Sequence, residues 1–534
     1  MARRFACILL SLLLLVSMSG AGAAAEEYAV EGIDFRPGWD TADDNLVFYE
    51  IFVGSFSDSD GDGIGDLRGI ISRMDYLNDG DPASGRSLGV EGIWLTPIFS
   101  SPSYHKYDVT DYYTIDPSFG TLADLQELIA LCHARGVKLI LDFPINHTGD
   151  RNSWYKKFLN GHLMHNPDHP FYDFYSWLPA DAQVPSGRHY ARVPGRQLLV
   201  EANFSDNMPE PDFDSEAVRQ AYLDIALYYL DLGVDGFRFD AAKYIYLGDT
   251  AGNLAFWSWY AGELRKAKPD IYLVAEVWDS DGITNQYAQV MNCFNFTTSQ
   301  ADGLISQTAQ GGDVGRYVNY LAKHQAELKA VRPEAVNVPF IANHDTDRAA
   351  GYLPVSNGRM QMAANLYLLA PGSPFIYYGE EIGLKGARGG ASSDANRRLA
   401  MRWGDGDTVR DPVGTTYDPA KQTSGTVESI AAQSFSIYNY YKKLLMIRKA
   451  NPEIARGDIT PLLFSGSKAG GFVSTWQGSS VAVLHNPTGS DVTLDLSQAT
   501  ELAFTGISAT IGMGTASLDG TLLTLEAQTS VVLR

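Results

Sequence analysis

Four short segments of this sequence place charged or imidazole side chains directly after an apolar run. The segments read LILDFPINH (139–147), GVDGFRFDAAK (233–243), LVAEVW (273–278) and FIANHD (340–345). Their polar members are Asp142, Asn146, His147, Arg238, Asp240, Lys243, Glu276, His344 and Asp345. One such group alone is typical of a structural ion pair. Four together are costly to bury without a functional use, so we expect them to form one active site.

Carboxylates beside an arginine suit the hydrolysis of glycosidic bonds. The retaining form of this reaction uses a carboxylate nucleophile and a carboxylic acid that donates a proton, about 5 Å apart. Alternation along a strand places Arg238 and Asp240 on one side, and the guanidinium would lower the pKa of this carboxyl group. The apolar neighbours Val277 and Trp278 would help Glu276 to hold its proton near neutral pH. A third carboxylate can stabilise positive charge on the sugar carbon, and histidines can donate hydrogen bonds to sugar hydroxyls.

A separate acidic loop, DSDGDGIGD over residues 58–66, has the spacing of a calcium-binding loop. Its oxygen ligands would come from Asp58, Asp60, Asp62, Asp66 and the carbonyl group of Ile64. Carboxylates at positions 1, 3 and 5, glycine at 6 and a carbonyl at 7 match the start of such a loop. Position 12 is Gly69 and a strand pattern precedes the loop, which argues against an EF-hand. We expect one structural Ca²⁺, with a solvated acidic turn as the alternative.

The elements that must position these side chains alternate along the chain. Apolar runs typical of strands cover residues 46–53, 92–95, 137–143, 236–239, 271–277, 336–342 and 374–378, with a weaker run at 291–296. Apolar residues at helical spacing predict helices over 122–135 and 215–232. This alternation predicts parallel βαβ units, and eight strands over roughly 400 residues fit a (β/α)8 TIM barrel, whose active site lies at the carboxyl ends of the strands. A doubly wound sheet is the alternative, but no glycine-rich phosphate turn follows the first strand.

Three further segments depart from the barrel pattern. Residues 148–214 are rich in aromatic residues, His, Pro and Asn and lack a long helical pattern, which predicts a domain inserted after the third strand. Residues 429–449 predict the last helix. Beyond it, alternating runs predict an antiparallel β-sandwich, with strands at 471–476, 481–484 and 492–496. The predicted boundaries are 26–147 and 215–454 for the barrel, 148–214 for the inserted domain and 455–534 for the sandwich.

Length and charge limit the possible functions. The 534 residues correspond to three or four units of about 150 residues each. Hydrophobic residues make up 45%, so a large core can form. Lys plus Arg number 41 and Asp plus Glu 63, which gives a net charge of −22. This acidity excludes broad electrostatic binding of nucleic acid or of an anionic membrane and is compatible with neutral substrates.

The first 25 residues have the form of a secretory signal peptide. Arg3 and Arg4 precede an apolar run over 6–18, and the small residues over 19–25 offer A-x-A cleavage sites. The run is shorter than the about 20 apolar residues that a transmembrane helix needs. We therefore expect a secreted or periplasmic protein without a membrane anchor. For Cys132 and Cys293 we expect free, buried thiols, with a single bridge as the alternative.

Together, the four polar segments resemble the four signature regions of the α-amylase family, glycoside hydrolase family 13. The resemblance covers nearly the whole chain after residue 25, because the insertion and the terminal sandwich match the family's domains B and C. It implies that Asp240 is the nucleophile, Glu276 the general acid/base and Asp345 the stabiliser of the transition state. The resemblance also assigns substrate contacts to Tyr107, Asp108, His147, Arg238, Lys243, His344 and Arg398.

Two features place the sequence between α-amylases and oligo-1,6-glucosidase-like members. Lys243 is followed by Tyr244, where many α-amylases have His. The segment MPEPD at 208–212 resembles the family's fifth region but carries acids at the variable positions. The acidic loop resembles the calcium loop of relatives of the oligo-1,6-glucosidases. A second calcium site of the α-amylase type would use Asn146 and Glu210.

The resemblance implies an α-amylase that cleaves α-1,4-glucosidic bonds in starch, glycogen and maltooligosaccharides by double displacement. The alternatives on the same fold are an exo-acting α-glucosidase or oligo-1,6-glucosidase and a 4-α-glucanotransferase. A different class is a non-catalytic carbohydrate-binding relative, against which the intact trio Asp240, Glu276 and Asp345 argues. We expect a monomer whose partner is an α-glucan.

Overall fold

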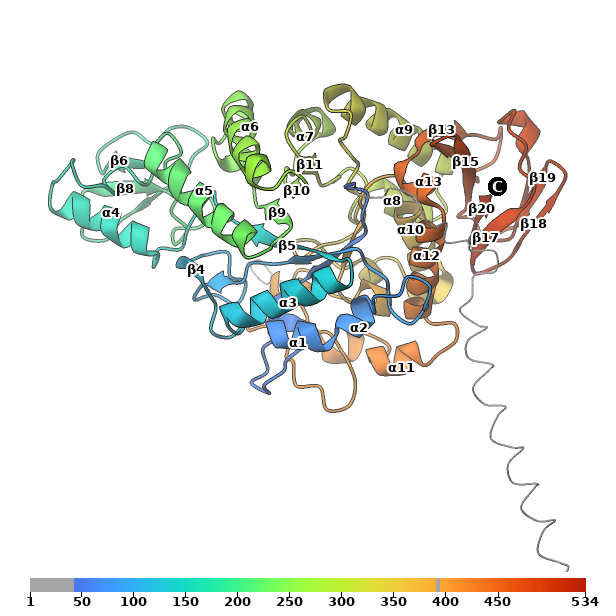
Figure 1. Cartoon of the computed structure of the whole chain (residues 1–534), viewed down its shortest axis with the longest axis horizontal. Helices are drawn as coiled ribbons and strands as arrows, with labels where there is room; N and C mark the ends of the chain where they lie inside the picture. Colours follow the sequence, from blue (N-terminus) through green and yellow to red (C-terminus); the bar gives the residue numbers. More distant parts are fainter. Residues whose placement is uncertain (1–42, 390–393) are drawn as a thin grey trace, which may run out of the picture.

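The computed structural model describes residues 43–389 and 394–534 (Figure 1). The predicted signal peptide, residues 1–25, lies outside this range. Within the described residues, no helix has the length and apolar character needed to cross a membrane.

A curled, all-parallel sheet of seven strands forms the centre of the molecule. Its order is β11-β10-β9-β5-β2-β1-β12. The strands are β1 (Phe48–Ile51), β2 (Gly92–Leu95), β5 (Lys138–Phe143), β9 (Gly236–Phe239), β10 (Tyr272–Ala275), β11 (Asn292–Cys293) and β12 (Phe375–Tyr377). These strands lie within seven of the eight predicted runs, and the predicted TIM-barrel-like fold is confirmed.

The eighth run, residues 336–342, is not a strand, and this prediction was wrong. Its Val338 forms only an isolated parallel bridge with Phe294. On its other side, the carbonyl of Pro339 accepts a hydrogen bond of 3.0 Å from the backbone nitrogen of Phe375 in β12. Because proline has no N–H group, the segment cannot complete a ladder. It nevertheless occupies the gap between β11 and β12 and so closes the ring of strands.

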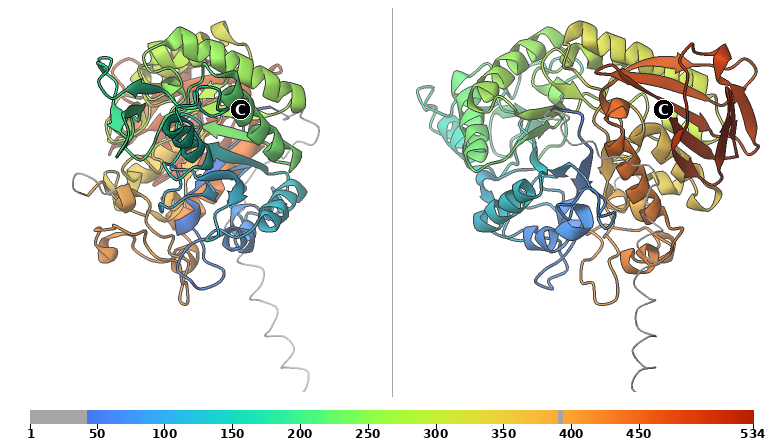
Figure 2. Two further views of the ribbon diagram at one scale, coloured as in Figure 1. Left: turned by 90° about the vertical axis from the view of Figure 1, so that its left-hand side faces the viewer. Right: turned by 45° about the vertical axis from the view of Figure 1, so that its right-hand side comes forward.

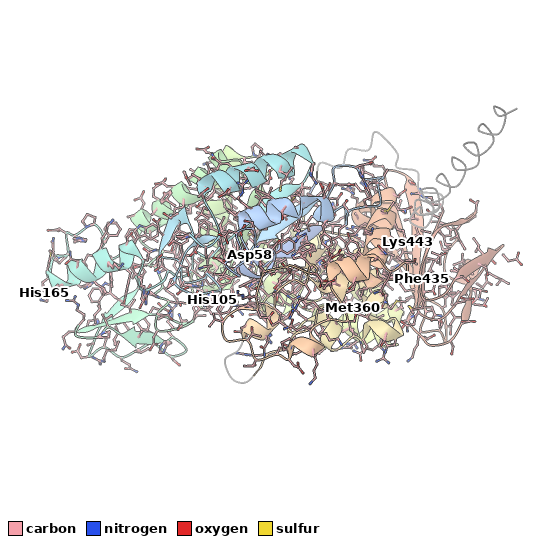
Figure 3. All side chains as sticks on the ribbon, turned by 90° about the horizontal axis from the view of Figure 1, so that it is seen from below. Asp58, His105, His165, Met360, Phe435 and Lys443 are labelled. Carbon is pink, nitrogen blue, oxygen red and sulfur yellow. The ribbon has the colours of Figure 1, made fainter. Side chains whose placement is uncertain are left out.

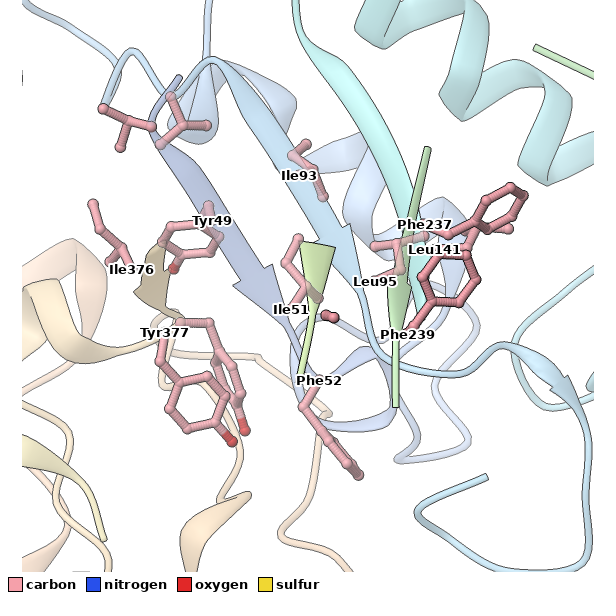
Figure 4. Close-up of a cluster of buried hydrophobic side chains, with 14 of the residues drawn as sticks. Tyr49, Ile51, Phe52, Ile93, Leu95, Leu141, Phe237, Phe239, Ile376 and Tyr377 are labelled. Atoms are coloured by element: carbon pink, nitrogen blue, oxygen red, sulfur yellow. The ribbon is translucent and has the colours of Figure 1, made fainter. Parts of the chain in front are cut away.

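Side chains alternate between the inside of the barrel and the layer under the helices. Phe48, Trp94, Ile140 and Val274 belong to one buried cluster, inside the barrel. Their neighbours along the same strands, including Tyr49, Ile93 and Leu141, belong to the larger cluster against the helices, as does Phe237 of β9 (Figure 4). Gly92 leaves room for the ring of Phe48, which a Cβ atom there would approach to 2.3 Å.

Helices cover the outside of this sheet. The barrel helices are α1 (Leu67–Ser72), α2 (Met74–Leu77), α3 (Leu122–Ala134), α5 (Glu216–Asp231), α6 (Thr250–Ala267), α7 (Asp281–Tyr287), α8 (Leu304–Ala309), α9 (Val314–Val331), α10 (Arg359–Leu368), α11 (Val427–Ala431), α12 (Ile437–Ala450) and α13 (Pro452–Arg456). The predicted single helix over 429–449 is wrong, because the chain forms α11 and α12 instead. The Ser436 hydroxyl accepts a hydrogen bond from the backbone nitrogen of Asn439 and caps the second of them.

The segment 148–214 projects from the barrel at the end opposite the C-terminal sheets (Figure 1). It contains α4 (Ser153–Leu163), which the sequence pattern did not predict, and an antiparallel sheet in the order β6-β8-β7. These strands are β6 (Trp177–Pro179), β7 (Tyr190–Arg192) and β8 (Leu198–Glu201). The short pair β3 (Phe99–Ser100) and β4 (Asp111–Ile115) lies in the loop after β2.

Two antiparallel sheets form the C-terminal part (Figure 2). The larger has the order β13-β14-β15-β20-β17 and the smaller β16-β19-β18. Their strands are β13 (Asp458–Leu462), β14 (Gly470–Trp476), β15 (Ser479–Asn486), β16 (Val492–Asp495), β17 (Ile507–Gly512), β18 (Ala516–Asp519), β19 (Leu522–Leu525) and β20 (Thr529–Leu533). The terminal antiparallel sheets of the prediction are confirmed. Both Cys132 and Cys293 are free and buried, as expected.

Candidate active site

One buried arginine gathers three carboxyl groups at the carboxyl ends of β5, β9 and β10. Arg238 Nη1 donates to Asp142 Oδ1 at 2.9 Å and to Asp240 Oδ1 at 2.6 Å, and Nη2 donates to Glu276 Oε2 at 2.5 Å. The parallel register sets Asp142 directly beside Arg238. Ala241, the residue after Asp240, has φ of 43°, in the left-handed region, and its N–H faces Glu276 Oε2. A residue other than glycine is strained in this backbone conformation, and such strain is often found at functional sites.

The surroundings of the Asp240 and Glu276 carboxyl groups favour different protonation states. Burial raises the pKa of Glu276 to about 7, although Arg238 opposes this shift. Burial also raises the pKa of Asp240, but its short contact with Arg238 favours the ionised form. The arrangement therefore suits Glu276 to donate a proton near neutral pH while Asp240 acts as a carboxylate.

A third carboxyl group, that of Asp345, follows the segment that closes the ring. Its Oδ2 lies 3.0 Å from His344 Nε2 and its Oδ1 lies 2.8 Å from Arg398 Nη2. Burial alone would raise the pKa of Asp345, but these two cations hold it below its ordinary range. The Arg397 guanidinium, which we did not predict, donates to the backbone carbonyl of Asp345 at 2.6 Å. Asp345 is thus kept ionised opposite the other two acids.

Tyr107 connects these groups. Its hydroxyl donates to Asp142 Oδ2 at 2.8 Å and lies 2.6 Å from His344 Nε2. Asp108, the next residue, lies outside this network, because its Oδ1 accepts hydrogen bonds from the hydroxyl groups of Ser101 and Ser103. The structure therefore brings Tyr107 to the carboxylates, whereas Asp108 supports the loop.

His147 has one ring nitrogen left for a ligand. Its Nδ1 accepts a hydrogen bond of 2.9 Å from Asn146 Nδ2, and burial lowers its pKa to about 4, so the ring is neutral. Among the described residues, Nε2 has no partner. With the Asn146 amide as donor to Nδ1, the proton of the neutral ring sits on Nε2, where it can be donated to a sugar hydroxyl.

Two pairs of aromatic rings, whose contacts the sequence did not predict, involve the segments that follow β9 and β10. Trp278 stacks on Phe296 with a centroid distance of 4.7 Å and an interplanar angle of 11°, and it is 42% exposed. Lys243, predicted to contact substrate, donates to the carbonyl of Trp278 at 2.7 Å and to Asp279 Oδ2 at 3.0 Å. Phe204, from the inserted segment, lies 4.9 Å from Tyr244. Exposed ring faces of this kind can stack on sugar rings, and the sequence could have indicated them only once the strand ends were known to meet.

The sequence pattern also missed Glu50. This residue is 1% exposed on β1, and its Oε1 lies 2.6 Å from His344 Nδ1. Its signal is a charge inside the otherwise apolar run FYEI over 48–51.

The acidic loop, in which Figure 3 labels Asp58, gathers three of the four predicted calcium-binding carboxylates. Carboxylate oxygens of Asp58, Asp60 and Asp66 lie within 4.8 Å of one another. Calcium–oxygen bonds of about 2.4 Å allow such spacing around one ion, so this donor set fits Ca²⁺. Asp62 lies outside the group, and its Oδ1 accepts a hydrogen bond of 2.7 Å from the backbone nitrogen of Ile64.

The second predicted metal site has weaker support. Glu210 accepts hydrogen bonds from the backbone and side-chain nitrogens of Asn203, and burial with the nearby Glu201 raises its pKa to about 8. The Asn146 Oδ1 atom is buried and has no partner in the described part of the chain. This site stays a prediction.

Comparison with known proteins gives consistent matches. Residues 50–457 match the family model described as the α-amylase catalytic domain. Alpha-amylase 3 of Dictyoglomus thermophilum is 34% identical over 447 residues, which cover 83% of this chain and 84% of that protein. The 4-α-glucanotransferase of Thermotoga maritima is 30% identical over 349 residues, covering 64% and 73%. The structure of Eubacterium rectale Amy13B has a TM-score of 0.84 at 33% identity, covering 92% of this chain and 96% of that one.

Proposed function

Because the chain belongs to the α-amylase family, glycoside hydrolase family 13, we propose that it is a retaining α-amylase that cleaves α-1,4-glucosidic bonds in starch, glycogen and maltooligosaccharides. The coarser assignment, a hydrolase or transferase acting on α-glucans, follows from the family itself. The similarity to Alpha-amylase 3 supports the more specific proposal, that the chain is an α-amylase.

One observation carries the proposed mechanism, namely that Asp240 and Glu276 bind the two terminal nitrogens of the same guanidinium. This adjacency fits the carboxyl spacing of about 5 Å that retaining enzymes use. Asp240 attacks the anomeric carbon while Glu276 gives its proton to the leaving oxygen, and a covalent glycosyl ester forms. Glu276, now a carboxylate, takes a proton from water, which attacks the same carbon and releases Asp240. Asp345 stabilises the positive charge that develops on the sugar.

A time course of products from amylose, maltotriose and pullulan tests this proposal. We expect mixed maltooligosaccharides from amylose and the α-anomer as the first product, detected by NMR. Glucose alone, released from non-reducing ends, would contradict the α-amylase proposal and favour an exo-acting glucosidase. A β-anomer would contradict the retaining mechanism.

Transfer of the glycosyl group to a second sugar, in place of hydrolysis, is an alternative reaction that one observation favours. Trp278, which stacks on Phe296 and is 42% exposed, follows the proposed proton donor Glu276 by two residues. A sugar held there could compete with water for the covalent intermediate. Products longer than the substrate, formed from maltotriose, would identify a glucanotransferase.

The rate should depend on pH through Glu276. The acid must be protonated to act, and its pKa is about 7. We therefore expect kcat/KM for maltooligosaccharides to decrease roughly tenfold for each pH unit above about 7. Rates measured in buffers of constant ionic strength test this expectation, and a rate that stays level up to pH 9 would contradict the role of Glu276.

We also propose that the acidic loop binds a structural Ca²⁺ through Asp58, Asp60 and Asp66. Such an ion would hold the loop between β1 and α1, and at a hundredfold excess over Kd it would stabilise the fold by about 2.7 kcal/mol. Removal with EDTA should lower Tm by several degrees, and added Ca²⁺ should restore it.

Two substitutions distinguish the three carboxylates that lie close together in the structure from the larger set of calcium ligands that the sequence predicts. Asp60→Asn should abolish the effect of EDTA on Tm, because its carboxylate belongs to the group. Asp62→Asn should retain it, because this side chain lies outside the group of close carboxylates. An unchanged Tm of the parent protein in EDTA would contradict the calcium proposal.

The signal-like segment supports a further proposal, that the mature protein is secreted after cleavage near residue 25. Determination of the amino-terminal sequence of the protein from culture medium or periplasm tests it.

A further inference from the structure

Glu50 lies beneath the catalytic carboxylates and contacts only one member of the substrate-facing set. It follows Phe48 on the inner side of β1, where its neighbours across the sheet are Trp94 and Tyr377. Its Oε1 faces two donors of His344, the ring Nδ1 at 2.6 Å and the backbone nitrogen at 3.3 Å. Glu50 therefore acts as a hydrogen-bond acceptor.

The hydrogen-bond directions at the other ring nitrogen fix the protonation of His344. Its Nε2 lies 2.6 Å from the Tyr107 hydroxyl and 3.0 Å from Asp345 Oδ2. The Tyr107 hydrogen is directed to Asp142 Oδ2 at 2.8 Å, so the tyrosine oxygen must accept from His344. Nδ1 must also carry a hydrogen, because its partner is a carboxylate. Both ring nitrogens are donors only in the imidazolium form.

We propose that Glu50 is a positioning residue that holds His344 as an imidazolium, whose charge and Nε2–H face Asp345 and the reacting sugar. This inference rests on the proposed glycosidase function. Glu50 does not touch the reacting atoms, since His344 lies between it and Asp345. Its effect is to keep a fixed positive charge beside Asp345 over the whole working pH range.

The charged groups around His344 agree with this role. Glu50 faces it from β1, Asp345 from the same loop and Tyr107 from the loop after β2, while Arg398 donates to its backbone carbonyl. Burial alone would lower the pKa of His344, but Asp345 and Glu50 raise it to about 10. Without the Glu50 charge, the imidazole should lose its proton within the working range.

The Glu50→Gln variant tests the proposal through the pH dependence of its defect. The amide can still accept the Nδ1 hydrogen bond but carries no charge. We expect kcat/KM close to that of the parent protein at pH 5, where His344 is protonated in both. At pH 8 we expect a loss of about tenfold to a hundredfold, which corresponds to losing one charged hydrogen bond. Dividing kcat/KM of the variant by that of the parent at each pH removes the pH dependence that both proteins share through Glu276.

Glu381→Gln provides a matched control. Glu381 is also a fully buried glutamate of the barrel, and its Oε1 accepts hydrogen bonds from Tyr49 and Tyr76. This substitution makes the same change of functional group at a buried site without a hydrogen bond to His344, so its ratio to the parent should not show the loss between pH 5 and 8 that we expect for Glu50→Gln. A ratio for Glu50→Gln that is equally constant from pH 5 to 8 would reduce Glu50 to a structural residue and overturn the proposal.

NMR of ¹⁵N-labelled histidine gives a readout that does not depend on activity. We expect both His344 ring nitrogens to be protonated at pH 8 in the parent protein and one to be deprotonated in Glu50→Gln, assigned with His344→Asn. A neutral His344 in the parent protein would overturn the inference even if the enzyme cleaves glucans. An imidazolium in a protein that cleaves no glucan would leave the Glu50 contact established and contradict the proposed function instead.

Discussion

Asp240→Asn should lower kcat on amylose by roughly 10⁴-fold or more, because the amide cannot form the covalent ester through which the reaction proceeds. The substitution preserves the size of the side chain and one acceptor for Arg238 Nη1, so the barrel should remain folded. Initial rates with reducing-end detection, together with Tm, separate loss of chemistry from loss of structure.

Asp235→Asn is the matched control for this substitution. Asp235 is a buried aspartate just before the same strand, β9, and its Oδ2 accepts a hydrogen bond of 2.8 Å from the backbone nitrogen of Leu139 at the opposite end of the barrel. Its loss should lower Tm but leave kcat within a few fold. As a positive test, azide should restore turnover of an activated maltoside by Asp240→Ala and give the β-glycosyl azide. Amylose cleavage by Asp240→Asn at the parent rate would contradict the assigned nucleophile.

Glu276→Gln should show a defect that depends on the leaving group. General acid catalysis contributes about 10²–10⁴-fold, and a sugar leaving group needs this proton. Fluoride needs far less assistance, so we expect a large loss of kcat/KM on maltooligosaccharides and a small one on α-maltosyl fluoride. The decrease in rate above pH 7 should also disappear, because the titrating acid is absent.

The second half of the reaction gives an independent measurement on the same variant. Water attacks slowly without the Glu276 carboxylate as base, so the covalent intermediate on Asp240 should accumulate. A burst of fluoride equal to the enzyme concentration, and a glycosylated active-site peptide in mass spectrometry, would report it. Equal losses on both substrates with no burst would assign the proton donor to another residue.

Local patterns predicted the barrel strands because each is short, apolar and bounded by polar residues. The boundaries of β2 and β9 agree with the sequence runs at 92–95 and 236–239. Residues 336–342 have the same apolar character, but Pro339 interrupts their pairing, and neighbouring segments hold the run in place without a ladder. Residues 429–449 have helical spacing throughout, yet the cap at Ser436 starts a new helix within them.

The candidate site was predictable where its residues follow the strands that a barrel brings together. Arg238, Asp240 and Glu276 meet because adjacent parallel strands end at one level. The partner Glu50 was not predictable, because a contact between β1 and the loop after Phe340 depends on how the whole ring closes. Asp108 carries the right residue type but is turned toward two serines, which residue spacing does not indicate.

The shared guanidinium of Arg238 has a consequence for the net charge of the candidate active site. The linked network contains five acids, Glu50, Asp142, Asp240, Glu276 and Asp345, and three cations, Arg238, His344 and Arg398. With Glu276 protonated, four negative charges face three positive ones, so one negative charge is left over. A neutral sugar does not balance it, whereas the positive charge of an oxocarbenium-like transition state does. A sugar mimic with a protonated ring nitrogen would provide the same balance and should therefore bind more tightly than the neutral sugar of the same shape.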